Sequence, residues 1–290
     1  MFRFVSILAV VVGVFLASMP VRAPAQFLRT PVPGTVDLEL VLAVDVSGSV
    51  DYAEGRLQRK GYIDAFTNPK LLQTIRNGRN GRIAVTYMEW AGWGLFRQMV
   101  DWTVIHDQAS AEAFARELDR LDTISGRGTS ISGAIDVSLQ LFAMNPFKGD
   151  RRVIDISGDG PNNSGLSVTW YRDNAVSRGI TINGLPILSD AGNIVSDLDV
   201  YFKECVIGGP GAFVIAAENF ETFADAILRK MILEVADARS DAAPGVHKAQ
   251  FLGPQRGPNP LFNEEQTRYF PNCDIPNNAR PQQFPAPGGF

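Results

Sequence analysis

Three polar loops of the sequence carry the residue types that bind hard metal ions. Asp45, Ser47 and Ser49 occupy alternate positions in the first loop. Thr129 follows a glycine-rich segment, and Asp159 lies between two glycines. Carboxylates and hydroxyls are hard oxygen ligands, so we expect a divalent cation, with Mg²⁺ first and Ca²⁺ or Mn²⁺ as alternatives. The simpler interpretation of the first loop is that its Asp and Ser only cap the next helix.

The loops follow predicted strands whose ends would place them together. Residues 38–44 form an apolar run interrupted only by Glu39, which predicts a buried strand, and a further strand is expected at 152–156. Alternating strands and helices predict a doubly wound α/β fold, with a mostly parallel six-stranded sheet and one antiparallel edge strand. In the order 3-2-1-4-5-6, the first and fourth strands flank the switch point, where such sheets bind ligands. Asp45 and Asp159 are therefore expected to face one crevice.

The other elements are predicted from apolar spacing and turn residues. Strands are expected at 83–90, 96–105, 181–188 and 213–217, and helices at 52–66, 110–121, 131–144, 169–178, 195–204 and 220–235. The pair Asn68-Pro69 is expected to end the first helix, and Asn219 to cap the last. The last helix has a regular apolar stripe, which we interpret as a face packed on the sheet.

Composition divides the chain into four regions. Residues 1–25 have the pattern of a secretory signal peptide, with an apolar run shorter than the roughly 18–20 residues of a membrane anchor. A Pro/Gly linker at 26–36 precedes the α/β domain at 37–237. Residues 238–290 hold nine of the eighteen prolines and are expected to form an irregular tail. We expect an exported protein, periplasmic or secreted, with no transmembrane segment after signal cleavage.

Charge and cysteine content narrow the function classes. The net charge of −4 excludes a strongly basic nucleic-acid-binding protein. Cys205 and Cys273 are predicted to form a disulfide in an exported chain, the alternative being two unpaired thiols. His106 and His247 lie far apart in the sequence and do not form a zinc signature.

Three segments together resemble the metal-ion-dependent adhesion site of von Willebrand factor type A domains: Asp45-x-Ser47-x-Ser49, Gly128-Thr129-Ser130 and Ser157-Gly158-Asp159-Gly160. The resemblance covers residues 36–237. It implies that the hydroxyls of Ser47, Ser49 and Thr129 bind the metal directly. The two Asp residues would act directly or through water, and one position on the ion would stay open for the Asp or Glu carboxylate of a partner.

Two further segments, 87–90 and 206–213, resemble a family of exported bacterial proteins that carry this domain and have no known activity. The adhesion motif does not explain Trp90, Trp93 and Trp102, which lie around the predicted hairpin. Their simplest interpretation is edge-strand and core packing. The alternative is a partner-binding surface, because Trp is enriched at interface hot spots.

We expect a protein-binding module and not an enzyme, because neutral hydroxyls leave much of the ion's charge for an external carboxylate. The first alternative is a Mg²⁺-dependent phosphatase of the haloacid dehalogenase kind, with Asp45 as the nucleophile. That family has a second acid two residues later, where Ser47 stands here, and Lys148 is the only Lys between the second and third loops. The second alternative is a module whose metal is purely structural.

Overall fold

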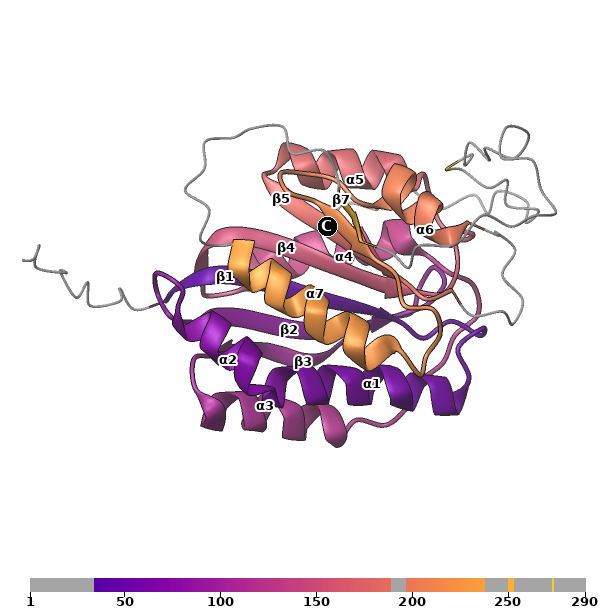
Figure 1. The fold of residues 1–290 in the computed structure, drawn as a ribbon. Helices are drawn as coiled ribbons and strands as arrows, with labels where there is room; N and C mark the ends of the chain where they lie inside the picture. Colours follow the sequence, from indigo (N-terminus) through magenta and orange to yellow (C-terminus); the bar gives the residue numbers. More distant parts are fainter. Residues whose placement is uncertain (1–33, 189–196, 238–249, 253–272, 274–290) are drawn as a thin grey trace, which may run out of the picture. The chain divides into compact units, whose positions relative to one another are not determined.

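A computed structural model describes residues 34–188, 197–237, 250–252 and 273. Within these residues one sheet has seven strands (Figure 1). The strands are β1 (Thr35–Asp45), β2 (Ile83–Trp90), β3 (Phe96–Ile105), β4 (Lys148–Gly158), β5 (Ile180–Pro186), β6 (Phe213–Ile215) and β7 (Gln250–Leu252).

The strand order is β3-β2-β1-β4-β5-β6-β7, with β3 antiparallel to β2 and every other neighbouring pair parallel. This confirms the predicted doubly wound sheet, its antiparallel edge strand and the order of its first six strands. The seventh strand was not predicted, because β7 is only three residues long and lies in the Pro-rich region without an alternating pattern. The parallel strands end at the right-hand edge of the sheet in Figure 1, where β1 and β4 are neighbours.

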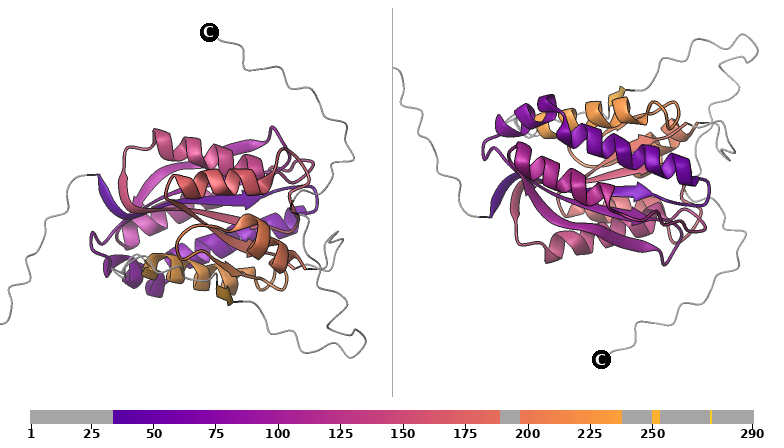
Figure 2. Two further views of the ribbon diagram at one scale, coloured as in Figure 1. Left: turned by 90° about the horizontal axis from the view of Figure 1, so that it is seen from above. Right: turned by 90° about the horizontal axis from the view of Figure 1, so that it is seen from below.

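Helices pack on both faces of the sheet (Figure 2). One face carries α1 (Tyr52–Thr67), α2 (Pro69–Arg76), α3 (Gln108–Asp119) and α7 (Phe223–Asp237). The other carries α4 (Ile131–Met144), α5 (Val168–Ser177), α6 (Leu198–Tyr201) and the π-helical turn η1 (Phe202–Val206). Within the described ranges no helix is long and apolar enough to cross a membrane.

The first strand shows why the sheet is buried on both sides. Successive side chains of a strand point to opposite faces. Leu40 and Leu42 of β1 belong to the core beneath α1 and α7, whereas Val41 and Ala43 belong to the core beneath α4 and α5. All four side chains are fully buried, as the apolar run predicted.

Asn68 explains a helix that the sequence interpretation missed. The prediction that Asn68-Pro69 ends the first helix is correct, but a second helix, α2, begins at once. Asn68 closes α1 with its backbone N–H and caps α2 with its side chain, which accepts from Lys70 N at 2.9 Å. Pro69 occupies the first turn of α2, where its missing N–H costs nothing.

Two other helix boundaries differ from the prediction. The helix expected at 195–204 consists of α6 and η1, which together span 198–206, while residues 195 and 196 lie outside the described residues. The last helix begins at Phe223, and Asn219 Oδ1 accepts from Thr222 N at 2.9 Å. Thr222 C=O accepts the first helical hydrogen bond, from Ala226 N. Asn219 therefore orders the turn that enters α7 and is not the N-cap itself.

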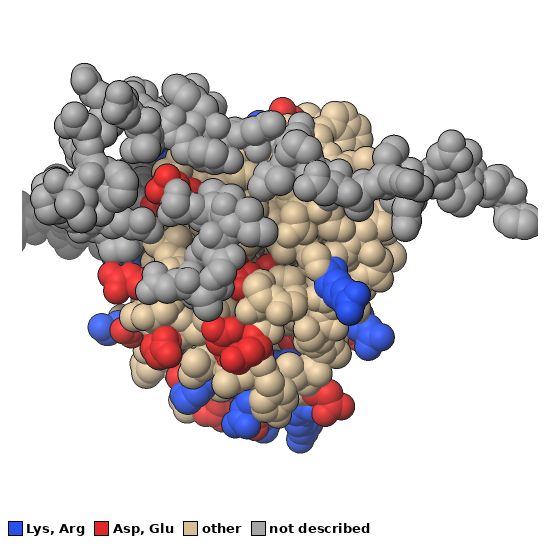
Figure 3. All heavy atoms as spheres, turned by 90° about the vertical axis from the view of Figure 1, so that its right-hand side faces the viewer, with Lys and Arg blue, Asp and Glu red and all other residues tan. Residues whose placement is uncertain are grey.

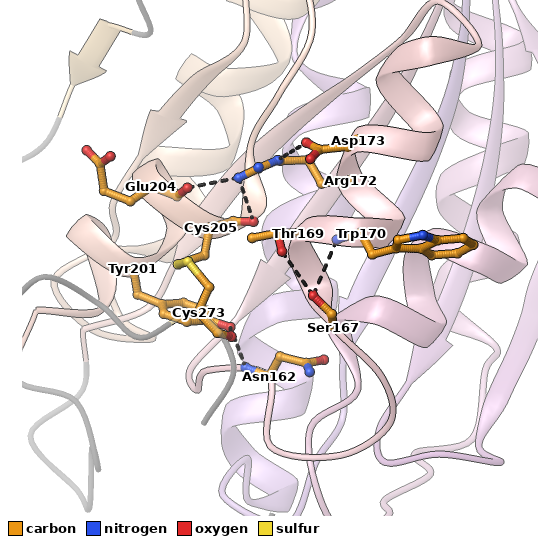
Figure 4. Close-up of a disulfide and its surroundings, with 10 residues drawn as sticks. All are labelled: Asn162, Ser167, Thr169, Trp170, Arg172, Asp173, Tyr201, Glu204, Cys205 and Cys273. Carbon is orange, nitrogen blue, oxygen red and sulfur yellow. Dashed lines mark hydrogen bonds and ion pairs between the residues drawn. A yellow bond between two sulfur atoms is a disulfide. The ribbon is translucent and has the colours of Figure 1, made fainter. Parts of the chain in front are cut away.

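The predicted disulfide between Cys205 and Cys273 is confirmed, with a Cα–Cα distance of 5.4 Å (Figure 4). Cys205 is buried in η1. Tyr201 Oη donates to Cys273 C=O at 3.4 Å and accepts from Asn162 N at 3.1 Å. The bridge thus connects a residue of the tail to η1, and Tyr201 links both to the segment that follows β4.

Candidate metal centre

The first loop is held in a tight turn where β1 ends. Val46 N donates to Trp90 C=O at 2.8 Å, which extends the pairing with β2 by one residue. Ser47 N then donates to Asp45 Oδ1 at 2.7 Å, and Val50 N donates to Ser47 C=O at 2.9 Å. Asp51, and no residue of the metal motif, caps α1 through a capping box with Glu54. The interpretation of this loop as a simple helix cap is therefore wrong.

The second loop is tied to the first by its backbone. Gly126 N donates to Val46 C=O at 3.1 Å, so the chain runs alongside the first loop. Gly128 then adopts a φ of +79°, a conformation that favours glycine. Ser130 caps α4, with its Oγ accepting from Gly133 N. Thr129 is thus fixed between a glycine turn and a helix start.

The third loop follows β4 and closes against the other two. A Cβ atom on Gly158 would lie 2.9 Å from Asp45 Oδ2, so only glycine lets β4 approach this carboxylate so closely. Asn163 Oδ1 accepts from Thr129 N at 2.8 Å, and Asn163 N donates back to Thr129 C=O at 2.9 Å. This reciprocal pair holds the segment after Asp159 against the second loop.

The five predicted side chains converge at this edge of the sheet. The hydroxyl oxygens of Ser47 and Ser49 are 3.1 Å apart, and Ser49 Oγ donates to Asp159 Oδ1 at 2.8 Å. Thr129 Oγ1 lies 3.5 Å from the place where a Cβ of Gly160, the residue after Asp159, would stand. Asp45 lies behind them and holds the Ser47 backbone.

The electrostatics of the cluster leave negative charge uncompensated. Asp45 is fully buried, and its Oδ2 has no hydrogen-bond partner. Burial raises the pKa of Asp45 well above its usual range, the nearby Asp159 raises it further, and hydrogen bonds from Ser47 oppose both. Burial also raises the pKa of Asp159, against the hydrogen bond from Ser49. An added cation would relieve both carboxylates.

The ligand types fit a hard divalent cation. Among the described residues, no three His, Cys, Asp or Glu side chains form a cluster able to hold a metal. The present cluster has two carboxylates and three hydroxyls instead, and Mg²⁺ is bound through few carboxylates plus neutral oxygens and water. The orphaned Oδ2 of Asp45 gives such an ion or its bound water a buried acceptor.

Further acidic side chains surround the cluster. Figure 3 shows Asp and Glu side chains near the middle of the face seen from the right-hand side of Figure 1, with Lys and Arg side chains around them. The pKa of Glu54 is raised mainly by burial and also by the charges of Asp51, Asp159 and Glu221. We call Asp51, Glu54 and Glu221 the acidic rim. Its field attracts cations and repels a free carboxylate.

The predicted tryptophan surface is largely wrong. Trp90 is fully buried beneath α4, because it points into the core from the end of β2. Trp102 packs on Phe142 of α4 with ring centroids 5.7 Å apart and donates its Nε1 hydrogen to Leu141 C=O. Trp93 is 43% exposed and remains available for contact. Core packing, the simpler interpretation, therefore holds for two of the three.

Two asparagines at the site were not predicted from the sequence. Asn163 fixes Thr129, and Asn162 Oδ1 accepts from Ser132 N at the start of α4 at 3.0 Å. The sequence signal was an Asn-Asn pair three residues beyond Asp159. Because both act on backbone groups of another loop, only the three-dimensional arrangement reveals their role.

Three solved structures with a similar fold have low sequence identity. Proximal thread matrix protein 1 from the mussel byssus is 14% identical with a TM-score of 0.51, covering 70% of this chain and 46% of that one. The pilus adhesin SpaC from Lactobacillus rhamnosus GG is 13% identical with a TM-score of 0.51, covering 72% and 31%. A von Willebrand factor type A protein from Catenulispora acidiphila is 15% identical with a TM-score of 0.49, covering 70% and 43%.

The chain thus spans less than half the length of each of these solved chains, and at such identities the likeness concerns the fold alone. A search of the curated proteins finds no match. The family model described as "Protein of unknown function (DUF1194)" matches residues 35–239, which is most of the chain. The chain has a von Willebrand factor type A-like fold and belongs to the DUF1194 family.

Proposed function

We propose that the protein is a metal-dependent protein-binding module that engages an Asp or Glu carboxylate of a partner through a divalent cation. The observation that carries the proposal is the buried Oδ2 of Asp45, which lacks a partner beside a second carboxylate and three hydroxyls. An unsatisfied buried carboxylate oxygen is costly unless something binds to it. A cation from solution answers that need, with Mg²⁺ expected first and Ca²⁺ or Mn²⁺ as alternatives.

Each residue has a distinct role in this proposal. Ser47, Ser49 and Thr129 would hold the ion through their hydroxyls, and Asp45 and Asp159 would balance its charge directly or through water. When bound, the cation supplies an electrophilic position for a carboxylate oxygen. Backbone hydrogen bonds already orient Ser47 and Thr129, so little ordering is left for the binding step. The acidic rim would repel a partner's carboxylate from the metal-free protein.

Apolar side chains beside the site would extend the contact with a partner. Trp93 N donates to Ser164 Oγ at 3.0 Å, and its ring lies close to Gly165. Leu166, next in the chain, is 53% exposed. Trp is enriched at protein interfaces, so this exposed pair next to the metal centre would suit contact with a partner. We assign them this role in place of Trp90 and Trp102.

The position of Lys148 argues against the phosphatase alternative. Lys148 pairs with Thr35 at the start of β1, whereas Asp45 is at the end of the same strand. Ten residues of strand separate the two ends by roughly 33 Å. Lys148 therefore cannot assist chemistry at Asp45, which supports the proposal that the protein is not an enzyme of this kind.

We also propose that the protein works outside the cytoplasm, in the periplasm or after secretion. The disulfide between Cys205 and Cys273 supports this, because such bonds persist in oxidising compartments.

A relaxation experiment tests metal binding and the open position on the metal separately. Mn²⁺ added to the protein, followed by water proton relaxation, reports both binding and the presence of an exchangeable water on the ion. Acetate should then reduce the relaxation enhancement, and acetamide, its neutral analogue, should not. Metal binding without an acetate effect would indicate a purely structural ion, and absence of Mn²⁺ binding would overturn the proposal. Asp45→Ala should remove the signal, and Glu221→Gln, on the exposed rim, should keep it.

A second experiment addresses the partner. Immobilised wild-type protein should capture the same proteins from extracts in Mg²⁺ or Mn²⁺, lose them in EDTA, and regain them when the metal is restored. Asp45→Ala and Ser47→Ala should capture less. Undiminished capture in both EDTA and Asp45→Ala would contradict a metal bridge.

A further inference from the structure

A cavity lies on the α1 face of the sheet, between the first half of α1, the ends of β1 and β2, the first loop of the metal centre and residues 123–125. Its volume is about 350 Å³. Small-molecule sites span roughly 300–1,000 Å³, so this one suits a small ligand. We call it the α1 cavity. Gln58, Arg59, Tyr87 and Glu89 form its buried floor, and Tyr52 and Ser125 lie at its exposed mouth.

The floor of the α1 cavity is a buried ion pair. Arg59 Nη2 donates to Glu89 Oε1 at 2.7 Å, and Tyr87 Oη donates to the same oxygen at 3.3 Å. Arg59 Nη1 also donates to Leu121 C=O at 2.6 Å, which fixes the guanidinium. Glu89 is 1% exposed and its pKa is still raised by burial, against the effect of Arg59. The carboxylate is therefore held in place but not fully satisfied.

Three buried polar atoms of the floor lack hydrogen-bond partners: Glu89 Oε2, Gln58 Oε1 and Arg59 Nε. Gln58 is 1% exposed, and its Nε2 donates to Asp45 C=O at 3.4 Å, which orients the amide. Unsatisfied buried groups are rare, because each loses its hydrogen bonds to water without a replacement. Three of them on one cavity indicate that something binds there, offering two donors and one acceptor.

The charges around the floor select the class of ligand. Arg59 and Glu89 neutralise each other, so the floor has no net charge. An anion would meet Glu89 and, at the mouth, Asp51. A cation would meet the guanidinium of Arg59. A neutral ligand with hydroxyl groups avoids both penalties, because a hydroxyl both donates and accepts.

We propose that the α1 cavity binds a small neutral polyhydroxylated ligand, a sugar or a linear polyol. Its hydroxyls donate to Glu89 Oε2 and Gln58 Oε1, and one accepts from Arg59 Nε. Tyr52, which is 66% exposed at the mouth, offers an aromatic surface to the ligand's C–H groups. None of the floor residues is a proposed metal ligand, but the cavity adjoins the metal loop, because Val46 and Gly48 also line it and Gln58 donates to Asp45 C=O. Binding is therefore tested without the metal.

Saturation-transfer NMR with the full chain in EDTA tests the inference with defined probes. Glucose and galactose represent the cyclic source of hydroxyls, and sorbitol and glycerol the linear one. Acetate and methylammonium are the charged controls. We expect at least one hydroxylated probe to bind and both controls to fail. Binding of a control alone, or of no probe, would overturn the proposal and leave ordered water as the content of the cavity.

Two variants and one control variant locate any binding. Gly55 lines the cavity, and an added Cβ would meet only ordinary contacts with Thr123 and Val50. Gly55→Leu should therefore fold, fill the cavity and abolish binding, whereas Gly55→Ala should retain it. Gln58→Leu removes one acceptor and should weaken binding about ten-fold, as the loss of one buried hydrogen bond does. Unchanged binding in both Gly55→Leu and Gln58→Leu would place the ligand elsewhere and overturn the proposal. A thermal melt of each variant checks folding.

Discussion

Two clusters of buried carboxylates lie close together in the chain and differ in what neutralises them. Asp155, inside β4, meets Lys230 and Glu234 of α7, and Lys230 forms ion pairs with both acids. All three side chains are fully buried. Asp159, four residues further along, and Asp45 meet hydroxyls and backbone N–H groups instead. The first cluster contains its own cation, and the second does not.

The comparison distinguishes a charge cluster that contains its own cation from one that can bind a cation from solution. Lys230 is additionally placed 5.5 Å from the centre of the Phe213 ring, and Asn183 Nδ2 donates to Glu234 Oε1 at 3.1 Å. These contacts hold α7 to the sheet, although Asp155 Oδ2 and Glu234 Oε2 also lack hydrogen-bond partners. The metal centre has equally fixed oxygens but no positive charge of its own, so it can accept a cation from solution. Both arrangements follow from where β4 places successive acids.

The largest effect should come from removing the internal cation. Lys230→Met leaves Asp155 and Glu234 buried without a positive partner, and breaking a buried pair in this way typically costs about 3–5 kcal/mol. Urea denaturation at pH 8 measures the loss. Lys148→Met, on the exposed start of β4, is the matched control and should change the free energy of unfolding by no more than about 0.5 kcal/mol. Equal effects of the two variants would contradict the structural role of Lys230.

The same cluster should make the stability of the protein depend on pH. Burial raises the pKa of Asp155 from 3.8 to about 7, Glu234 raises it as well, and Lys230 opposes both. Tyr62 of α1 also lies within the field of Asp155. Since the unfolded pKa is about 4, the folded protein binds more protons between roughly pH 4 and pH 7. Its free energy of unfolding therefore falls as the pH rises through that window.

Asp155→Asn tests this pH dependence, because it leaves Lys230 paired with Glu234 alone. The free energy of unfolding of wild type should fall relative to that of the variant as the pH increases from 5 to 8. Chemical denaturation at both pH values, in EDTA, measures it. A difference that stays constant over this range would show that Asp155 does not titrate there.

At the metal centre, the neutral variant Asp45→Asn should raise stability and lower metal affinity. Without metal, it removes an uncompensated buried charge and should raise the melting temperature. With Mg²⁺ or Mn²⁺, it should weaken metal affinity by roughly 10–100-fold, measured by calorimetry. Asp51→Ala, which removes the N-cap of α1 outside the cluster, should destabilise the metal-free protein instead. Destabilisation of the metal-free protein by Asp45→Asn would contradict the site's capacity to bind a cation from solution.

The smallest effect should come from the acidic rim. Glu221→Gln removes one exposed charge near the cluster, and screened surface charges contribute little. Metal affinity should fall by about two-fold or less at low ionic strength, and the difference should vanish in high salt. A salt-independent loss of ten-fold or more would mean that Glu221 itself binds the ion.

Much of this arrangement was predictable from local patterns. The apolar run before Asp45, the glycines around Asp159 and the alternation of strands and helices were enough to predict the strand order and the approach of Asp45 and Asp159, whereas Thr129 was placed with them through the family resemblance. The disulfide followed from two cysteines in a chain expected to be exported. These features depend on spacing along the chain, which the sequence displays.

The remaining features depend on contacts between distant segments. Asn68 both ends α1 and caps α2, whereas the pair Asn68-Pro69 in the sequence indicates only the end of a helix. Trp90 is only three residues before the exposed Trp93, yet its side chain points from the end of β2 into the core. Lys230 and Glu89 resemble ordinary surface residues in sequence, and only the structure shows that they are buried with partners. Sequence periodicity does not indicate which buried charge will meet another.

The most direct test of the central claim is a crystal of the protein grown or soaked with Mn²⁺ and measured at the manganese absorption edge. The account predicts one anomalous peak bounded by the hydroxyl oxygens of Ser47, Ser49 and Thr129, within direct or water-mediated reach of Asp45 and Asp159. The same crystal form of Asp45→Asn should show a weaker peak or none. A peak on the acidic rim alone, or the absence of any peak in a Mn²⁺-soaked wild-type crystal, would contradict it.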